Sequence, residues 1–123
     1  MNFTTETRAS QGVIISPGHP NNYNNSIDKS YRIQVTQGRV IEIKFSEFKL
    51  DPGIICEDYI KIEDGDNTLL LPPVCGIEPP SKIISHSHRV NVFFHADDSS
   101  PSPRYQKIRR WTLNWEESRP FFN

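Results

Sequence analysis

The stretch RVIEIKFSEF (residues 39–48) decides the fold class, because its apolar and polar residues alternate with a period of two. On a β-strand every second side chain points to the same face, whereas a helix returns to the same face every third or fourth residue. Ile41, Ile43 and Phe45 therefore share one face, and the polar residues between them occupy the other. This pattern predicts a strand with one buried face and one solvent-exposed face.

The same alternation recurs in short runs along the chain, separated by turn-forming segments such as DGDN (64–67). The expected strands are GVIIS (12–16), YRIQV (31–35), RVIEIKFSEF (39–48), DYIKIED (58–64), TLLL (68–71), KIIS (82–85), RVNVFFH (89–95) and RRWTLNWEE (109–117). We expect Pro72-Pro73 to end the strand before it, since proline cannot donate a ladder hydrogen bond. About eight short strands without a convincing helix predict an all-β fold, an antiparallel β-sandwich of two packed sheets.

The alternation also predicts which side chains form the core between the two sheets. In the last expected strand, Trp111, Leu113 and Trp115 share one face. We expect them to pack against apolar residues of the other strands, namely Phe45, Ile60, Ile62, Val92 and Phe94.

Length and composition favour one domain, because 123 residues with 35% hydrophobic residues can form a single core but not two. We expect a flexible N-terminal segment (1–10), the domain itself (11–117) and a tail or linker (118–123). A net charge of −1 gives no reason to expect nucleic acid, and no apolar run reaches the roughly 18 residues of a membrane span. The first residues lack the apolar stretch of a signal peptide, so either the protein is cytosolic or such a signal has been removed, and we favour removal.

Sequence motifs of the common enzyme classes are missing. The chain contains no G-x-S-x-G, no H-E-x-x-H and no glycine-rich phosphate loop. His86 and His88 would share one face of a strand, as in a zinc site, but no third ligand is obvious near them. No spacing selects a pair of carboxylates for glycoside hydrolysis. We therefore expect no catalytic residues.

The two cysteines, Cys56 and Cys75, are either buried free thiols or one disulfide. In the loop-entropy description, a bond that closes about 20 residues stabilises the fold by roughly 3 kcal/mol. No C-x-x-C pair supports zinc or redox chemistry. The N-x-S/T sequons at Asn2 and Asn24 are candidate glycosylation sites and favour an extracellular location.

A basic cluster near the C-terminus is one candidate binding site. It could bind heparan sulfate or an acidic protein, or it could line the outward side of the last strand and its loop. Its members are Arg104, Lys107, Arg109 and Arg110.

Three aspartates form the other candidate site. Asp51, Asp58 and Asp97 lie at the ends of different expected strands, where acids are also common as solvated loop residues. If their loops share one edge of the sandwich, their oxygens would suit a hard cation such as Ca²⁺. Periodicity alone does not establish that the loops meet.

Eight pieces of the chain, in this order, resemble a CUB domain over about residues 11–115. They are GVIISPGHPNNY, YRIQV, IEIKFSEFKLD, CEDYIKIEDG, CG (75–76), PSKIIS, VNVFFHADDSS and WTLNW. The segment DKSYRI is similar to its counterpart in the calcium-binding first CUB domains of complement-initiating serine proteases. Like those domains and PDGF-type precursors, the chain lacks the first cysteine pair of the common pattern, and Lys29 stands where its second cysteine is expected.

CUB domains are extracellular β-sandwiches that act as binding modules, so the resemblance implies secretion, a non-catalytic role and a disulfide between Cys56 and Cys75. Many of them bind one calcium ion at an edge of the sandwich. Carried over position by position, the calcium ligands fall on Asp51, Asp58, Asp97 and Ser99, with Asp98 and Ser100 beside them. Tyr23 falls on the tyrosine that orients the first acid, here Asp51, where glutamate is usual.

We therefore expect a secreted module that recognises a protein partner in a calcium-dependent way. Oxygens left over on the acidic loops would pair with a lysine or arginine of the partner. The alternatives are heparin or glycan recognition through the basic cluster, and a structural spacer in a larger secreted protease, receptor or growth-factor precursor.

Overall fold

The computed structural model describes residues 5–98 and 108–120, and this part of the chain contains strands but no helix. The strands are β1 (Thr5–Arg8), β2 (Gln11–Ile15), β3 (Ile27–Gln34), β4 (Val40–Lys49), β5 (Tyr59–Asp64), β6 (Leu69–Val74), β7 (Ile83–Ile84), β8 (Arg89–Ala96) and β9 (Arg110–Ser118). No helix long and apolar enough to cross a bilayer exists in the described ranges. The predicted all-β class is confirmed.

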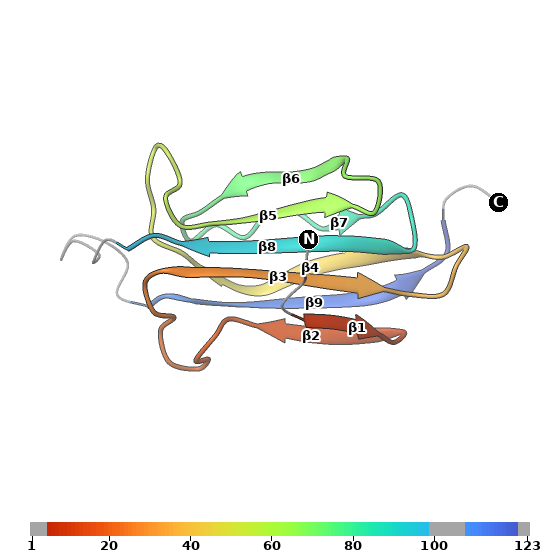
Figure 1. Cartoon of the computed structure of the whole chain (residues 1–123), viewed down its shortest axis with the longest axis horizontal. Helices are drawn as coiled ribbons and strands as arrows, with labels where there is room; N and C mark the ends of the chain where they lie inside the picture. Colours follow the sequence, from red (N-terminus) through yellow and green to blue (C-terminus); the bar gives the residue numbers. More distant parts are fainter. Residues whose placement is uncertain (1–4, 99–107, 121–123) are drawn as a thin grey trace.

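The strands form two sheets that pack face to face (Figure 1). One sheet has the order β1-β3-β8-β5-β6, and the other has the order β2-β9-β4-β7. The pairs are antiparallel except that of β1 with β3, which is parallel. The expected antiparallel sandwich is confirmed, with one parallel strand added at an edge.

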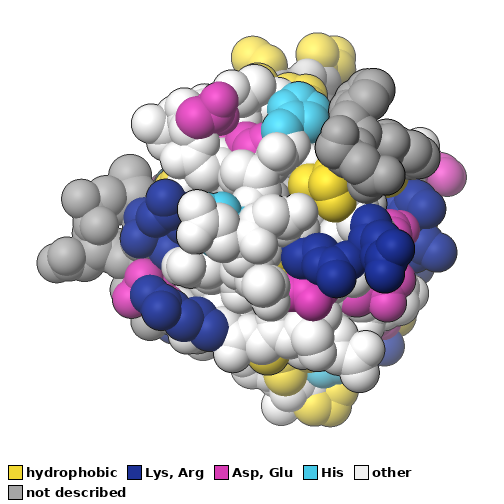
Figure 2. Space-filling model, turned by 90° about the vertical axis from the view of Figure 1, so that its right-hand side faces the viewer, with side chains coloured by type: hydrophobic (Ala, Val, Ile, Leu, Met, Phe, Trp, Pro, Cys, Tyr) yellow, Lys and Arg dark blue, Asp and Glu magenta, His cyan; other side chains and the backbone are white. Residues whose placement is uncertain are grey.

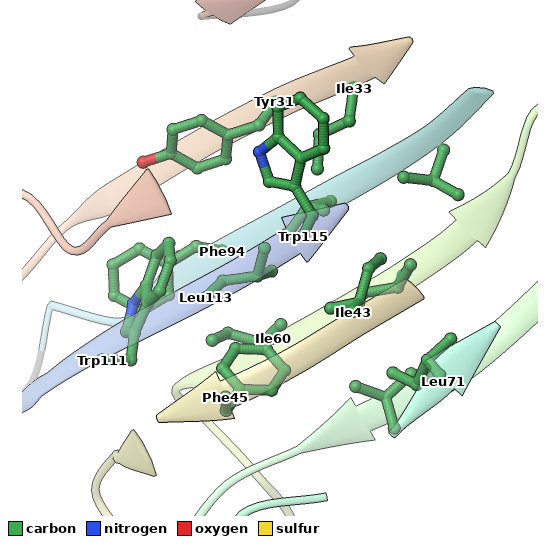
Figure 3. Close-up of a cluster of buried hydrophobic side chains, with 14 of the residues drawn as sticks. Tyr31, Ile33, Ile43, Phe45, Ile60, Leu71, Phe94, Trp111, Leu113 and Trp115 are labelled. Carbon is green, nitrogen blue, oxygen red and sulfur yellow. The ribbon is translucent and has the colours of Figure 1, made fainter. Parts of the chain in front are cut away.

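The core lies between the sheets, and Figure 3 shows side chains from both sheets meeting there. Trp111 is fully buried in it, with its ring edge-to-face against Phe94 at 5.4 Å and against Tyr31 at 6.0 Å between centroids. Every residue expected in the core is buried: Phe45, Ile60, Ile62, Val92, Phe94, Trp111, Leu113 and Trp115. Burial of each such side chain contributes about 1.5–3 kcal/mol, so this core is the main source of stability.

Three strands differ clearly from the prediction, and one of them, β3, begins at Ile27 rather than at Tyr31. β1 forms inside the segment expected to be flexible, because its backbone pairs with β3, with Thr5 opposite Tyr31. β6 continues to Val74, so the expectation that Pro72 and Pro73 end it is wrong. The strand accommodates both prolines because it lies at the edge of its sheet, where its register with β5 also shifts.

The disulfide implied by the resemblance is present between Cys56 and Cys75, whose Cα atoms lie 5.6 Å apart. It joins the loop that precedes β5 to the chain just after β6. The amide of Leu50 donates to the carbonyl of Gly76 at 2.9 Å, which ties the start of the same loop to this region. The β4–β5 loop, which carries two of the predicted acids, is therefore fixed at both ends.

The turn between β5 and β6 is built around the buried carboxylate of Asp64. Its oxygens accept hydrogen bonds from the amides of Gly65 and His86, both at 2.8 Å, and from the hydroxyl of Ser87 at 2.6 Å. A Cβ atom at position 65 would lie 3.0 Å from Ser87 Oγ, so glycine leaves room for this arrangement. The predicted DGDN turn is confirmed, and it also anchors the loop before β8.

The end of the sandwich that carries this turn lies at the right of Figure 1 and faces the viewer in Figure 2. Lysine and arginine side chains there stand beside aspartate and glutamate side chains, with uncharged groups between the clusters. The described residues in this view therefore do not form a large surface of one charge.

Candidate functional site

The loops that carry the three predicted acids meet at the opposite end of the sandwich, at the left in Figure 1. Asp51 follows β4, Asp58 precedes β5 and Asp97 follows β8. The β2–β3 loop joins them, since the amide of Ser26 donates to the carbonyl of Asp97 at 2.8 Å. Antiparallel strand order therefore brings Asp51, Asp58 and Asp97 together, and we call this region the acidic end.

Asp58 lies at the centre of the acidic end and is only 1% exposed. Its Oδ1 accepts the amide of Asp97 at 3.0 Å, and its Oδ2 accepts the hydroxyl of Tyr23 at 2.7 Å. Nη2 of Arg109 also donates to Oδ2, at 3.3 Å. A buried carboxylate requires such partners, because an unpaired buried charge is strongly destabilising. Asp58 is thus held through both of its oxygens.

Asp51 lies beside Asp58, and its carboxylate is incompletely compensated. Its Oδ1 is 3.3 Å from Nε of Arg109, yet both atoms are buried without a hydrogen-bond partner. Burial raises the pKa of Asp51, the charge of Arg109 opposes this rise, and repulsion from Asp58 and Asp97 adds to it, so that the net shift is upward. Arg109 therefore does not outweigh the combined effect of burial and of the neighbouring acids on Asp51.

Glu57 is a further acid at this end that sequence reasoning missed. Its side chain is exposed, and a hydrogen bond with Asp97 together with repulsion between the two groups raises the pKa of Glu57. Nothing in its spacing distinguishes it from an ordinary loop acid. Together with Asp51 and Asp58, these acids make four carboxyl groups beside Arg109, the one cation described among them.

Sequence reasoning also assigned Arg109 to the wrong environment. The expectation that it lies in an outward basic cluster is wrong, because its side chain is only 8% exposed. Its guanidinium lies 4.4 Å from the centre of the Tyr23 ring, and Nη2 donates to Asn25 Oδ1 at 3.1 Å. Alternation could have revealed its burial, because Arg109 lies two residues before Trp111 and so falls on the same inward face. Its pairing with the acids depends on distant loops and could not be found in this way.

The basic cluster is thereby divided. Arg110 pairs with Glu47 at 2.6 Å and donates to the carbonyl of Pro20 at 2.9 Å. Arg104 and Lys107 lie outside the described residues. The described half of the cluster is committed to internal ion pairs.

Tyr23 contacts both acids, but differently from what the resemblance implies. Its hydroxyl donates to the carboxylate of Asp58, whereas towards Asp51 it accepts only the main-chain amide, at 3.4 Å. Burial, followed by the hydrogen bond to Asp58, raises the pKa of Tyr23 above its ordinary value, so the hydroxyl remains a donor at neutral pH. Tyr23 therefore orients Asp58 directly rather than the side chain of Asp51.

The other predicted positions are distributed as follows. Asp98 and the candidate glycosylation residue Asn24 are exposed. Ser99, Ser100 and Asn2 lie outside the described residues.

The histidine pair considered for zinc lies at the other end of the sandwich. Nδ1 of His86 is 3.5 Å from Oδ2 of Asp64, and His88 is partly buried. Across residues 5–98 and 108–120, no three His, Cys, Asp or Glu side chains are grouped closely enough for a preformed metal site.

The acidic end nevertheless fits calcium chemically. Carboxylate oxygens are the preferred ligands of calcium, and Asp51 Oδ1 is a buried oxygen without a hydrogen-bond donor. Two of the required carboxylates are engaged by Arg109, so their oxygens would have to turn from the guanidinium towards the ion.

Comparison with known proteins agrees with this architecture. The model of the CUB domain family matches residues 4–106. Human mannan-binding lectin serine protease 1 is 35% identical over 117 residues, which is 92% of this chain and 15% of that protein. Rat cubilin is 34% identical over 92 residues, which is 74% of this chain and 2% of that protein. The chain therefore spans only a small part of these relatives.

Solved structures give the same result. The crystal structure of the MASP-1 CUB2 domain bound to Ca²⁺ has a TM-score of 0.79 and 29% identity, covering 94% of this chain and 99% of that one. The CUB1-EGF-CUB2 domain of human MASP-1/3 has a TM-score of 0.80 and 32% identity, covering 94% of this chain and 42% of that one. The chain belongs to the CUB domain family, whose members are non-catalytic interaction modules of extracellular proteins.

Proposed function

We propose that this chain is a secreted module that binds a protein partner through the acidic end, with one calcium ion held there. The main support is that Asp51, Asp58 and Asp97 converge at one end of the sandwich, where Oδ1 of Asp51 is buried without a hydrogen-bond donor. A structurally similar domain, MASP-1 CUB2, has been solved bound to Ca²⁺.

Calcium would be held by the carboxylates of Asp51, Asp58 and Asp97 and by Ser99, with Asp98 and Ser100 as neighbouring oxygen donors. When bound, it would neutralise carboxylates that otherwise repel one another. Two hydrogen bonds orient Asp58 for this role, one from the hydroxyl of Tyr23 and one from the amide of Asp97. The acidic loops would then have one defined arrangement for a partner.

The surroundings of the site indicate the chemistry of that partner. Glu57 and Asp98 are exposed acids, and they favour a lysine or arginine side chain. Ile54 and Ile55, 107% and 81% exposed in the same β4–β5 loop, offer an apolar contact beside these acids. A polyanion such as heparan sulfate would be repelled at this end.

The calcium site is tested by thermal unfolding of the wild type and of Asp97→Ala in millimolar calcium and in EDTA. Extracellular calcium modules have dissociation constants of about 0.1–1 mM, and the tighter value gives about 1.4 kcal/mol of stabilisation at 1 mM calcium. For a domain of this size the wild-type melting temperature should rise by roughly 5 °C. Asp97→Ala should remove most of this rise, because it deletes a ligand without touching the core.

Asp98→Ala serves as the matched control, since Asp98 is the exposed neighbour of Asp97 and should retain most of the calcium effect. Wild-type curves that coincide in calcium and EDTA would contradict the calcium site. Binding of a lysine-containing partner or peptide that persists in EDTA would contradict calcium-dependent recognition while leaving the binding role intact.

A further inference from the structure

We propose that Arg109 is a built-in cation of the acidic end, which holds Asp51 and Asp58 together without metal and competes with calcium for them. The proposal rests on the calcium site proposed above. It has two consequences: the domain remains folded without calcium, and Arg109 sets how tightly calcium binds.

The position of the guanidinium is the first support. Its Nε lies 3.3 Å from Asp51 Oδ1 and its Nη2 lies 3.3 Å from Asp58 Oδ2, so one side chain bridges two of the three acids. The side chains of Arg109, Asp51 and Asp58 are 8%, 12% and 1% exposed. Water therefore compensates these acids only slightly, and the guanidinium takes much of that role.

The way Arg109 is held is the second support. Its amide donates to Asn22 Oδ1 at 2.9 Å, and its carbonyl accepts the amide of Tyr23 at 2.9 Å. At the other end of the side chain, the guanidinium packs on the Tyr23 ring at 4.4 Å and donates to Asn25 Oδ1 at 3.1 Å. Contacts at both ends aim the charge at the acids, unlike those of a flexible surface arginine.

Competition follows from the shared oxygens. Calcium binds carboxylate oxygens at about 2.3–2.6 Å, so an ion on Asp51 and Asp58 would lie close to the guanidinium that contacts the same groups. Like charges at such a separation repel, and an arginine does not lose its proton to relieve this. The contact with Asp51 lacks hydrogen-bond alignment, so it is the one that yields most easily to the ion.

The decisive experiment is calorimetric titration with calcium chloride of the wild type, Arg109→Met and Arg109→Lys. Methionine keeps the length of the aliphatic stem but removes the guanidinium and its charge, so the calcium Kd should fall by about tenfold or more. Lysine keeps the charge, so its Kd should stay near that of the wild type. In EDTA, Arg109→Met should melt well below the wild type, and millimolar calcium should close most of that gap.

Asn25→Ala provides an independent variant in case Arg109→Met does not fold. It removes an amide oxygen that holds Nη2 while every charge of the site remains. The guanidinium should then yield more readily, and the calcium Kd should fall by about two- to threefold.

The outcomes separate this proposal from the calcium site itself. Equal Kd values for the wild type and Arg109→Met, or for the wild type and Asn25→Ala when Arg109→Met does not fold, would overturn the role of Arg109 and leave the calcium site standing. Calcium binding by Arg109→Met but not by the wild type would support Arg109 as the resident cation and contradict calcium binding by the natural chain. No binding by any variant would overturn both proposals.

Discussion

Asp58 and Asp64 stand at the two ends of the same strand, β5, and both are 1% exposed, yet their carboxylates are compensated differently. Asp64 accepts three hydrogen bonds of 2.6–2.8 Å from two amides and a hydroxyl, all of them neutral donors. Asp58 shares its surroundings with three further acids and with Arg109, whose Nη2 lies 3.3 Å away. One carboxylate closes a turn, whereas the other belongs to a cluster with excess charge.

The difference shows that burial alone does not identify a binding site. At Asp64 the neutral donors satisfy both oxygens, so the group stabilises the turn and has little affinity left for a ligand. At the acidic end, Asp51 Oδ1 lacks a donor and the described charges do not balance. A buried carboxylate can therefore bind a cation when its oxygens lack donors, whereas burial by itself does not give it this affinity.

The largest effect is expected for Asp64→Asn. The substitution replaces one acceptor oxygen with an NH2 group, which then faces either the amide of His86 or the amide of Gly65 and the hydroxyl of Ser87. It should lower the free energy of unfolding by about 2–3 kcal/mol, equally in calcium and in EDTA. Urea unfolding followed by tryptophan fluorescence measures this.

The neighbouring Asp66→Asn is the matched control, because Asp66 is exposed and bonds only locally, to the amide of Thr68 at 3.0 Å. It should change stability little. A loss below 1 kcal/mol for Asp64→Asn would mean that its hydrogen bonds matter no more than those of a surface turn.

Asp58→Asn should have a smaller effect, and one that depends on calcium. The amide oxygen can still accept a hydrogen bond from Tyr23 or from the Asp97 amide, and removal of one charge relieves Asp51. In EDTA the free energy of unfolding should fall by about 1–2 kcal/mol, less than for Asp64→Asn, because weaker repulsion of Asp51 partly offsets the lost ion pair with Arg109. The stabilisation of about 1.4 kcal/mol that calcium gives the wild type should disappear.

Asp64→Asn makes the comparison sharp, because it should retain the calcium stabilisation that Asp58→Asn loses. Denaturant titrations of both variants, each with calcium and with EDTA, give the four free energies of unfolding that this comparison needs. The same calcium increment in both variants would remove the distinction between the closed and the open carboxylate.

Glu47→Gln should have the smallest effect on the free energy of unfolding. It measures how much the partly exposed ion pair between Glu47 and Arg110 contributes. The hydrogen bond from Arg110 lowers the pKa of Glu47 below its ordinary 4.5, and burial only partly opposes this. A carboxyl whose pKa is lower in the folded state stabilises the protein above the unfolded pKa and loses this contribution as the pH falls through the folded pKa. The contribution should be below about 1 kcal/mol, since such pairs are weak.

Acid titration of stability from pH 6 to pH 2 measures this contribution. Below about pH 4.5 the wild type should lose more stability than Glu47→Gln, and above that the curves should run parallel. If Glu47→Gln lost more stability than the wild type on acidification, the ionised Glu47 side chain would not stabilise the folded state.

Much of the fold could be predicted from alternation, because a strand's faces depend only on local order. Residues 39–48 and 109–117 were assigned to strands with the correct inward residues, including Trp111. β1 could not be found in this way, because four residues form a strand only through pairing with β3. The end of β6 could not be predicted either. Proline indicates a strand end from local sequence alone, whereas β6 tolerates Pro72 and Pro73 because it lies at the edge of its sheet.

By itself the sequence determined the class of the fold, the faces of its main strands, and three acids whose family resemblance suggested a calcium site. It also supplied the two cysteines, although only the folded chain shows that they are bonded. The tertiary structure alone decided that Arg109 belongs among those acids and that Tyr23 serves Asp58. The physical reason is that alternation is encoded by adjacent residues, whereas compensation of buried charge depends on which distant loops meet.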